Sequence, residues 1–384
     1  MRSDKGRGVN GNLNDFDSMT VQRESLWLAP YAMHSVDTAG REHKESSHAY
    51  RAPYQRDRDR IVHSSAYRRL AHKTQVFTGE KGDYHRTRLT HTLEVSSVAR
   101  TIGRVLRLNE DLIESLALMH DIGHPPFGHA GEEILNECCA NCGGFNHNRQ
   151  AVRIVTVLEE RYPEFPGLNL SKEILSGQGS RIKGEKSSGR GQALLEVQIV
   201  DAADSIAYDT HDADDALELG LLNLDELLEL PLWGDAARRV QSEYSALDPQ
   251  QLRRAVVRQV IDILVTDLVD TTTARLKAAN IQSPAAVVGH DQQLVMPSSE
   301  VFQRKTQLEK FLFQHVYRHP AVLAERSLAG EALREMFQRF SEHPEGLPEG
   351  FRRHLEQRGV ARVVCDFLSG MTDRCALEEA SLRG

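Results

Sequence analysis

A membrane-spanning segment is absent from the 384-residue sequence. No stretch approaches the about 20 consecutive apolar residues that cross a bilayer, and the first residues contain no hydrophobic signal region. Residues 1–22 are instead rich in Gly, Asn, Asp and Ser, a composition that favours mobility. We therefore expect a flexible N-terminal tail at 1–22, one folded unit at 23–384, no membrane contact and a cytoplasmic location.

Cysteine is also scarce. The sequence has five cysteines, an odd number that cannot all pair within one chain. Three of them crowd together at Cys138, Cys139 and Cys142. A zinc site at this cluster would need a fourth ligand and a better spacing. Unpaired, inert thiols in a reducing compartment are therefore expected.

A net positive charge is absent as well, because the formal net charge is −8. Proteins that bind nucleic acids generally neutralise phosphates with a broad basic surface, so any single-stranded DNA binding is expected to be weak. The stretch from Arg51 to Lys73 runs against this balance and contains Arg56, Arg58, Arg60, Arg68 and Arg69. A local basic patch suits a small anionic ligand, although runs of charge are also typical of solvated helix faces.

Helical periodicity dominates what is present, and we find no internal repeat. Apolar residues recur at spacings of three and four in segments 88–108, 110–120, 147–160, 194–211, 252–277 and 303–319. Residues 75–87, with two central glycines, are predicted to form a small β-hairpin. The Gly- and Ser-rich segment 176–192 is predicted to be a flexible loop. The expected fold is all-α, with a helical core at about 60–215 and a helical C-terminal extension at about 216–384.

Ionisable residues interrupt the apolar faces of three of these predicted helices. They are His91 in segment 88–108, His120 and the adjacent Asp121 at the end of segment 110–120, and Asp204 in segment 194–211. A buried, unpaired carboxylate is costly, so Asp204 needs a cation or a strong hydrogen-bond donor.

One inward-facing histidine could simply be a core residue that bonds a backbone carbonyl. Two histidines and two aspartates at inward positions, in the order H…HD…D, favour a metal site instead. Imidazole and carboxylate ligands suit Mn²⁺, Fe²⁺, Co²⁺, Ni²⁺ or Zn²⁺, with Mg²⁺ less favoured by histidine. We expect a divalent metal ion, with Mn²⁺ as the first choice.

Further polar residues surround this set. The sequence HDIGHPPFGHAGEE contains glycines and prolines that should end a helix and bring His124 and His129 across a tight loop. Glu132 follows His129 by three residues, close enough on a helical turn to hold its imidazole. His147 and Asn148 begin the next predicted helix, where free N–H groups could hold phosphate oxygens. A simple helix-capping role for His147 is the alternative.

Several long fragments resemble the deoxyguanosinetriphosphate triphosphohydrolase family, a branch of the HD-domain phosphohydrolases. They are LAPYAMHS, YQRDRDRIVHSSAYRRLAHKTQVF, RTRLTHTLEV, LMHDIGHPPFGHAGE, GGFNHNRQ, VQIVDAADSIAYDTHD and VCDFLSGMTDR, and the match extends from about Leu28 to Leu377. The resemblance implies an all-α HD-domain fold and hydrolysis of a deoxynucleoside triphosphate (dNTP) to a deoxynucleoside and inorganic triphosphate. It also implies homo-oligomers and, in some members, activation by a second nucleotide.

The resemblance assigns roles to individual residues of this sequence. It implies metal ligation by His91, His120, Asp121 and Asp204, and a catalytic pair formed by His129 and Glu132. It implies sugar contacts from Gln75, Tyr208 and Asp212, and phosphate contacts from Arg88, His124 and His147. Asn148 belongs to the same pocket-forming motif.

The sequence also departs from the family pattern. Asn146 replaces a common Glu, Ser205 a common Asp or Glu, and Cys375 a common Tyr. Ser180 and Arg181 stand where relatives often have a Lys followed by His or Tyr, so Arg181 or Lys183 would have to take over any phosphate contact. The preferred base is not encoded in any motif we recognise. Two alternatives remain: another HD phosphohydrolase, such as a 5′-nucleotidase or phosphodiesterase, or a non-catalytic nucleotide- or ssDNA-binding protein.

Overall fold

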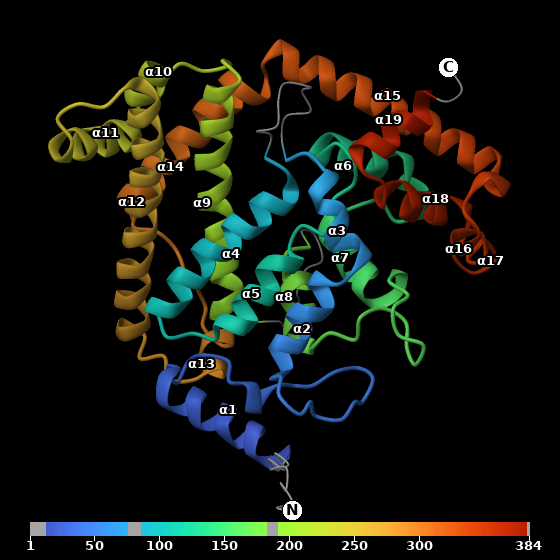
Figure 1. Cartoon of the computed structure of the whole chain (residues 1–384), viewed down its shortest axis with the longest axis horizontal. Helices are drawn as coiled ribbons and strands as arrows, with labels where there is room; N and C mark the ends of the chain where they lie inside the picture. The colour runs from blue at the N-terminus through green and yellow to red at the C-terminus, as the bar shows by residue number, and fades with distance from the viewer. Residues whose placement is uncertain (1–12, 76–85, 183–190, 382–384) are drawn as a thin grey trace, which may run out of the picture.

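The computed structural model describes residues 13–75, 86–182 and 191–381. These ranges are mainly helical, and β-structure within them is limited to isolated bridges (Figure 1). The all-α prediction is therefore confirmed. None of the helices in these ranges combines the length and apolar character needed to cross a bilayer.

The central helices come from the first 218 residues of the chain. Helix α4 packs against both α5 and α9, and α2 packs on α5. The elements of this part are α1 (Leu13–Trp27), η1 (Ser35–Asp37), α2 (Pro53–Val62), α3 (Ser65–Arg69), η2 (Leu70–His72), α4 (Arg88–Val105), α5 (Glu110–Met119), α6 (Gly128–Cys138), η3 (Ala140–Cys142), α7 (His147–Arg153), the π-helical turn η4 (Ile154–Leu158), α8 (Lys172–Ser180) and α9 (Leu195–Glu218).

The rest of the chain, from α10 onward, surrounds this centre on two sides (Figure 1). Helices α12 and α14 contact α9, whereas α15 packs across α6 and α18. The elements are α10 (Leu224–Leu228), α11 (Pro231–Glu243), α12 (Pro249–Ala278), α13 (Pro284–Val288), α14 (Ser299–Leu312), the π-helical turn η5 (Phe313–Tyr317), α15 (Pro320–Glu342), η6 (Pro344–Gly346), α16 (Glu349–Arg352), α17 (Leu355–Arg358), α18 (Val360–Ser369) and α19 (Asp373–Ser381).

Local sequence fixes where the central helices begin. The Thr87 hydroxyl accepts from the backbone N–H of Thr90, and the Thr90 hydroxyl accepts from the backbone N–H of Thr87, which forms a capping box at α4. The Asn109 side chain accepts from the backbone N–H of Leu112 at the start of α5. Such caps satisfy backbone donors that have no partner within the helix. They set the helical register that points His91 inward.

The hydrophobic interior has two parts. The larger one lies between α4, α5, α9 and α12 and includes Ile102, Leu116 and Val200. The smaller one joins α6 to the C-terminal helices through Leu135, Leu333 and other buried residues. Helix α6 is therefore anchored on the C-terminal region, while α4, α5 and α9 share the main core.

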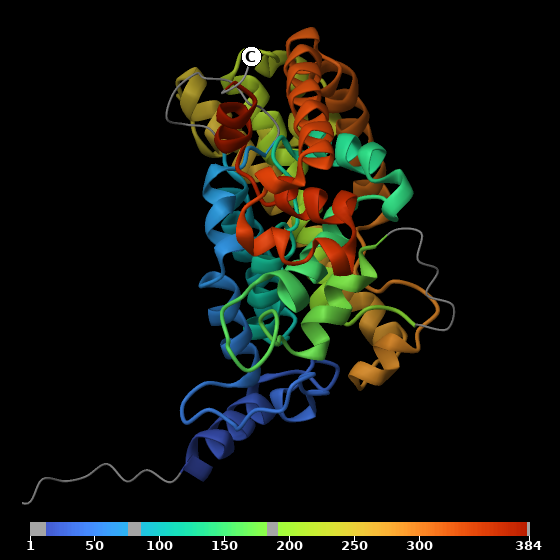
Figure 2. The same cartoon turned by 90° about the vertical axis from the view of Figure 1, so that its right-hand side faces the viewer.

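Two predicted flexible segments differ from the structure. Helix α1 occupies residues 13–27, so the predicted tail at 1–22 is helical from residue 13. Glu24 fixes this helix, since its carboxylate accepts from the backbone N–H of Ser35 at 2.7 Å. Helix α8 continues to Ser180, so the start of the predicted loop 176–192 is helical as well. In both views α1 lies at the opposite end of the molecule from α15 (Figure 1, Figure 2).

The predicted hairpin at 75–87 falls largely outside the described residues. Within the described ranges, its base is an isolated antiparallel bridge between Thr74 and Thr87. The prediction for residues 76–85 therefore stays a prediction.

The basic stretch 51–73 is largely used inside the fold. Arg51 pairs with Asp59 at 2.8 Å, and Arg60 pairs with Glu45 at 2.7 Å. Lys73 is buried and donates to the carbonyl oxygens of His124 and Ser369, at 2.5 and 2.8 Å. Arg51 and Arg60 therefore have carboxylate partners within the chain and Lys73 has carbonyl partners, while anion binding by the rest of this stretch stays a prediction.

Candidate metal centre and active site

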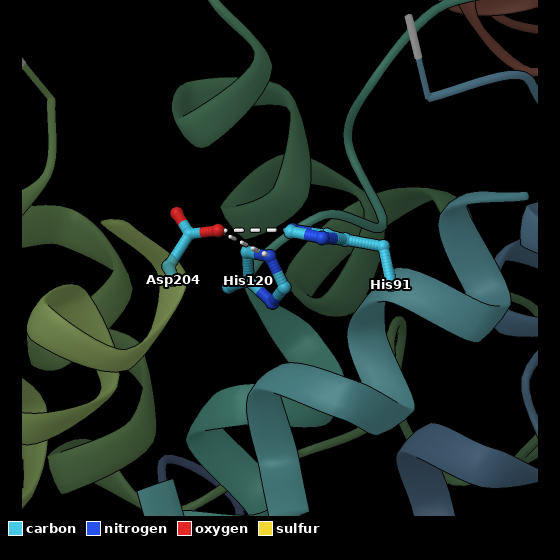
Figure 3. Close-up of side chains that lie close together, drawn as sticks. All are labelled: His91, His120 and Asp204. Atoms are coloured by element: carbon cyan, nitrogen blue, oxygen red, sulfur yellow. Dashed lines mark hydrogen bonds and ion pairs between the residues drawn. The ribbon is translucent and has the colours of Figure 1, made fainter. Parts of the chain in front are cut away.

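Three helices bring His91, His120 and Asp204 together (Figure 3). His91 lies on α4, His120 ends α5, and Asp204 lies on α9. The Asp204 Oδ1 atom is 3.0 Å from His91 Nε2 and 3.6 Å from His120 Nε2. Both histidines are buried, whereas the Asp204 side chain keeps 40% of its surface exposed. The group thus opens to solvent on the α9 side.

These atoms have the dimensions of a metal site. One ligand atom from each residue lies within 4.8 Å of the other two. His120 Nδ1 bonds the carbonyl oxygen of Ala117 at 2.6 Å, which turns Nε2 toward Asp204. Within the described ranges His120 Nε2 is buried and has no hydrogen-bond partner. An orphaned, buried imidazole nitrogen beside a carboxylate fits a divalent cation.

The acidity of Asp204 agrees with this arrangement. Burial opposes ionisation of the carboxyl, but the neighbouring His120 and His91 outweigh it and lower the pKa of Asp204 to about 2. For His91, burial is likewise outweighed by the hydrogen bond to Asp204, and the pKa is raised. Asp204 is therefore a carboxylate at neutral pH, as a metal ligand must be.

Asp121, the fourth predicted ligand, lies beside this group. Its Oδ1 atom is 3.4 Å from His120 Nε2 and 3.0 Å from His124 Nδ1. The other carboxylate oxygen accepts from Arg88 at 2.8 Å. Burial would raise the pKa of Asp121, but His124, His120 and Arg88 hold it well below its ordinary value. Arg88, expected at the phosphates, thus orients the Asp121 carboxylate in this structure.

Glycines let the loop after His120 pack closely. A Cβ atom on Gly123 would lie 2.0 Å from the carbonyl oxygen of His147, so only glycine fits against the start of α7. Gly128 has a φ of +56°, and a Cβ there would approach Arg88 Nη2 to 2.8 Å. The predicted tight loop is therefore present. It places His124 in a parallel stack on His147, with ring centroids 3.9 Å apart.

Glu132 contacts both His129 and His147. Its Oε2 atom is 3.5 Å from His129 Nδ1 but 2.8 Å from His147 Nδ1, and Oε1 accepts from the backbone N–H of His147 at 2.9 Å. Burial opposes ionisation, but these contacts hold the pKa of Glu132 well below its ordinary value. Half of the His129 side chain, 51%, is exposed. The sequence paired Glu132 with His129 alone, yet its shorter contacts are to His147.

Asn146 caps α7, so the capping role considered for His147 belongs to its neighbour. The Asn146 side chain accepts from the backbone N–H of Arg149 at 3.1 Å. Asn148 is buried and bonded within the scaffold, because its Oδ1 accepts from Gln178 at 2.9 Å. Gln178 also donates to the carbonyl oxygen of His120 at 3.2 Å. Asn148 therefore supports the position of His120 in this structure.

The predicted sugar contacts lie along α9 and at the edge of α4. Tyr208 and Asp212 follow Asp204 on the same face of α9. Gln75 is buried, and its Oε1 atom has no hydrogen-bond partner within the described ranges. The backbone carbonyl of Gln75 accepts from Arg88 at 3.4 Å. Arg88 thus links Gln75 to Asp121.

Comparisons with known proteins agree with this geometry. The HD domain family matches residues 88–209, and the phosphohydrolase-associated domain family matches residues 295–381. The deoxyguanosinetriphosphate triphosphohydrolase-like protein of Geobacter sulfurreducens is 42% identical over 363 residues, covering 92% of this chain and 94% of its own. Proteins of the same name from Caulobacter sp. and Leptospira interrogans are 45% and 41% identical, covering 91% and 93% of this chain and 95% and 96% of their own.

The chain belongs to the deoxyguanosinetriphosphate triphosphohydrolase-like family. Its HD domain contains the complete group His91, His120 and Asp204, together with Asp121. Membership of this HD phosphohydrolase family indicates a hydrolase, and the grouped ligands indicate a divalent metal centre.

The phosphohydrolase-associated region of this family member supplies Tyr317, which sequence reasoning missed. The Tyr317 hydroxyl donates to Asp212, and its ring lies 5.9 Å from that of Tyr208. Burial raises the pKa of Asp212 to about 7, although the Tyr317 hydroxyl lowers it in part. Tyr317 lies in a segment that was predicted to be helical. The sequence did not predict its contact with Asp212, because Tyr317 lies in the π-helical turn η5 and is far from Asp212 in the sequence.

Lys305 was also missed. Its ammonium group lies 2.5 Å from Asp209 and donates to the Ser205 hydroxyl at 2.9 Å. Ser205 departs from the family pattern, and the Lys305 charge is balanced by Asp209 and by Glu309 on its own helix. Burial raises the pKa of Asp209 to about 6, and Lys305 opposes that rise.

Arg181 is one of the two residues expected to take over the phosphate contact of a family lysine, and the other, Lys183, lies outside the described residues. The Arg181 Nε atom lies 2.6 Å from Oδ1 of Asp201, which precedes Asp204 by one helical turn. Arg181 thus borders the metal group while already paired.

All five cysteines are free, and the two potential metal-binding groups of the described ranges contain none of them. Burial raises the pKa of the Cys142 thiol to about 11.

Proposed function

We propose that this chain is a divalent-metal-dependent triphosphohydrolase that converts a dNTP into a deoxynucleoside and inorganic triphosphate. The observation that carries the proposal is the order of the side chains along α9. Asp204 belongs to the metal group, Tyr208 follows it by one turn, and Asp212 follows it by two turns. At 1.5 Å per residue, Asp212 lies about 12 Å along the helix axis from Asp204.

This spacing suits a nucleotide whose α-phosphate lies at the metal group. The sugar would then extend toward Tyr208 and Asp212, whose hydroxyl and carboxyl groups can hydrogen-bond a sugar hydroxyl. On the other side, His124, His129 and His147 form a cluster with ring centroids 3.9 to 6.2 Å apart. Imidazoles there can donate to the phosphate chain. The names of the relatives support a nucleoside triphosphate as the substrate class.

In the proposed reaction a water oxygen bonds to the α-phosphorus, and the bond from that phosphorus to the 5′ oxygen breaks. A divalent cation held by His91, His120 and Asp204, with Asp121 beside them, would supply Lewis-acid polarisation of the phosphate. His129 is exposed enough to reach substrate and is the candidate to give a proton to the departing 5′ oxygen. Glu132 would keep the imidazole oriented.

Several finer properties belong to the proposal. Mn²⁺ is the metal that we would supply first, since imidazole nitrogen and carboxylate oxygen together suit it. A homo-oligomer, a cytoplasmic location and activation by a second nucleotide remain predictions. Weak binding of single-stranded DNA is expected at most, because the chain carries a net charge of −8.

The test is to incubate the purified protein with each dNTP and Mn²⁺ and to separate the products by anion exchange. Release of a deoxynucleoside with intact triphosphate is expected, and the His120→Ala variant should release neither. Orthophosphate or pyrophosphate as the initial product would contradict the proposal and favour another HD phosphohydrolase. If single nucleotides are not hydrolysed, an equimolar dNTP mixture tests for an activator. No turnover of that mixture would favour a non-catalytic nucleotide-binding protein.

A further inference from the structure

A cavity of about 280 Å³ lies between the central helices and the C-terminal helices. Its walls come from α3, α7 and η4 on one side and from α16, α17 and α18 on the other. The residues that line it include none of the metal group at α4, α5 and α9 and none of the histidine cluster beside that group. The volume is near the lower end of the roughly 300–1,000 Å³ typical of small-molecule sites. The cavity is therefore separate from the active site and suits a small ligand.

Two of the arginines that line the cavity, Arg69 and Arg358, have guanidinium groups that make no hydrogen bond or ion pair within the described ranges. Arg358 is half-buried, and burial together with the nearby charges of Arg153 and Arg353 lowers its pKa. The Arg69 guanidinium reaches the turn after α18, since a Cβ atom on Gly370 would lie 3.3 Å from its Nη1 atom. Unpaired positive charge of this kind would be stabilised by an anion in the cavity.

The three carboxylates that line the cavity already have partners. Asp366 is buried and pairs with Arg153 at 2.6 Å. Glu160 pairs with Arg353. Glu159 accepts from a backbone N–H at the start of α3 at 2.8 Å. These carboxylates therefore leave the two free guanidinium groups without an anionic partner in contact.

Lys73 forms part of the inner wall of the cavity. Its buried ammonium group donates to the carbonyl oxygens of His124 and Ser369, at 2.5 and 2.8 Å. An ammonium group has three donors, so one N–H remains for a ligand. Burial lowers the pKa of Lys73 to about 7, and an adjacent anion would favour the charged form. The inner wall therefore adds a third cationic group and borders the back of the loop that carries His124.

We propose that this cavity binds a small phosphate anion, inorganic phosphate or pyrophosphate, through Arg69 and Arg358 with Lys73 behind them. The planar guanidinium group presents N–H donors in a fork that matches two phosphate oxygens, and such charge-assisted hydrogen bonds are among the stronger ones in proteins. Arg69 belongs to the basic stretch 51–73, so this site would fulfil part of the prediction of a patch for a small anion. The binding does not depend on the proposed reaction.

The test is isothermal titration calorimetry of the full-length protein with pyrophosphate, in EDTA and at constant ionic strength set with chloride. Saturable binding of one pyrophosphate per chain is expected. Arg69→Gln and Arg358→Gln should each weaken the Kd by about 10-fold or more, because each removes charge-assisted hydrogen bonds. Arg68→Gln is the matched control, since Arg68 is exposed on the same helix and does not line the cavity, and its Kd should stay within about two-fold of the wild-type value.

Thermal unfolding gives a second measurement and shows that each variant is folded. Pyrophosphate should raise the melting temperature of the wild-type protein and of Arg68→Gln, and should raise that of Arg358→Gln less. The inference would be overturned by the absence of saturable binding, or by an unchanged Kd in both Arg69→Gln and Arg358→Gln. Binding that is lost in His129→Ala but kept in Arg358→Gln would place the anion at the active site and would also overturn it. Failure to release triphosphate from a dNTP would refute the proposed function alone.

Discussion

Asp204 and Asp212 lie on the same face of α9, yet their carboxyl groups differ in acidity. Burial acts on both. At Asp204 the imidazoles of His120 and His91 outweigh it and lower the pKa to about 2. At Asp212 burial prevails and raises the pKa to about 7, with the Tyr317 hydroxyl only partly opposing it. The Asp204 end of the site therefore suits a cation, and the Asp212 end suits a ligand that forms hydrogen bonds.

The largest expected effect is at the cationic end. Asp204→Asn removes a charged ligand, and we expect loss of bound Mn²⁺ and a fall in kcat/KM of at least about 10³-fold, beyond the 10- to 100-fold typical of outer-shell changes. Asp212→Asn, the same exchange two turns away, should keep its Mn²⁺. Metal analysis of both variants checks this. Equal metal loss in the two would break the distinction between the ends of the site.

A smaller effect is expected from His129, which lies at the cationic end without belonging to the group of His91, His120 and Asp204. His129→Ala should lower kcat by about 10²- to 10⁴-fold, the usual contribution of a general acid or base. Its Mn²⁺ content should be unchanged. Steady-state kinetics together with metal analysis tests the role, and turnover near the wild-type rate would refute it.

At the sugar end, Tyr317→Phe removes only the hydroxyl that donates to Asp212. We expect kcat/KM to fall by about 10-fold, mainly through KM, because one hydrogen bond to a carboxyl group is lost. Tyr31→Phe is the control, since that hydroxyl bonds the backbone carbonyl of Leu106 away from the site. A KM within two-fold of the wild-type value would remove Tyr317 from the sugar end.

The two ends also differ in how far the sequence predicted them. His91, His120 and Asp204 interrupt regular apolar stripes, so helical periodicity predicted that each faces the core, and their H…HD…D order predicted that they share one site. Tyr317 and Lys305 come from η5 and α14, more than 90 residues from their partners on α9. Their contacts depend on how α14 packs against α9, which periodicity within a single segment does not determine.

Partners from other parts of the chain explain the remaining differences between prediction and structure. Glu132 was paired with His129 because three residues separate them on one helix, but the backbone N–H of His147 is a donor that spacing does not reveal. The basic stretch suggested a patch for a small anion, yet Glu45 and Asp59 pair with Arg60 and Arg51 within it. In each case a partner from another part of the chain decided the outcome.

The smallest and most specific prediction concerns pH. The pKa of Asp212 is about 7 in the folded chain and about 3.9 in an unfolded one. Between these values the folded state binds more protons than the unfolded state, so the free energy of unfolding contributed by Asp212 falls as pH rises, by at most about 1.4 kcal/mol per pH unit. The contribution is fully present below about pH 4 and is lost as pH rises through 7.

Asp212→Asn has no proton to lose, so its melting temperature should fall less between pH 5 and 8 than that of the wild-type protein. Asp291→Asn, at an exposed position, should keep the wild-type slope. Identical slopes for wild type and Asp212→Asn would mean that Asp212 is ionised in the folded chain, and the two ends of α9 would then carry the same charge.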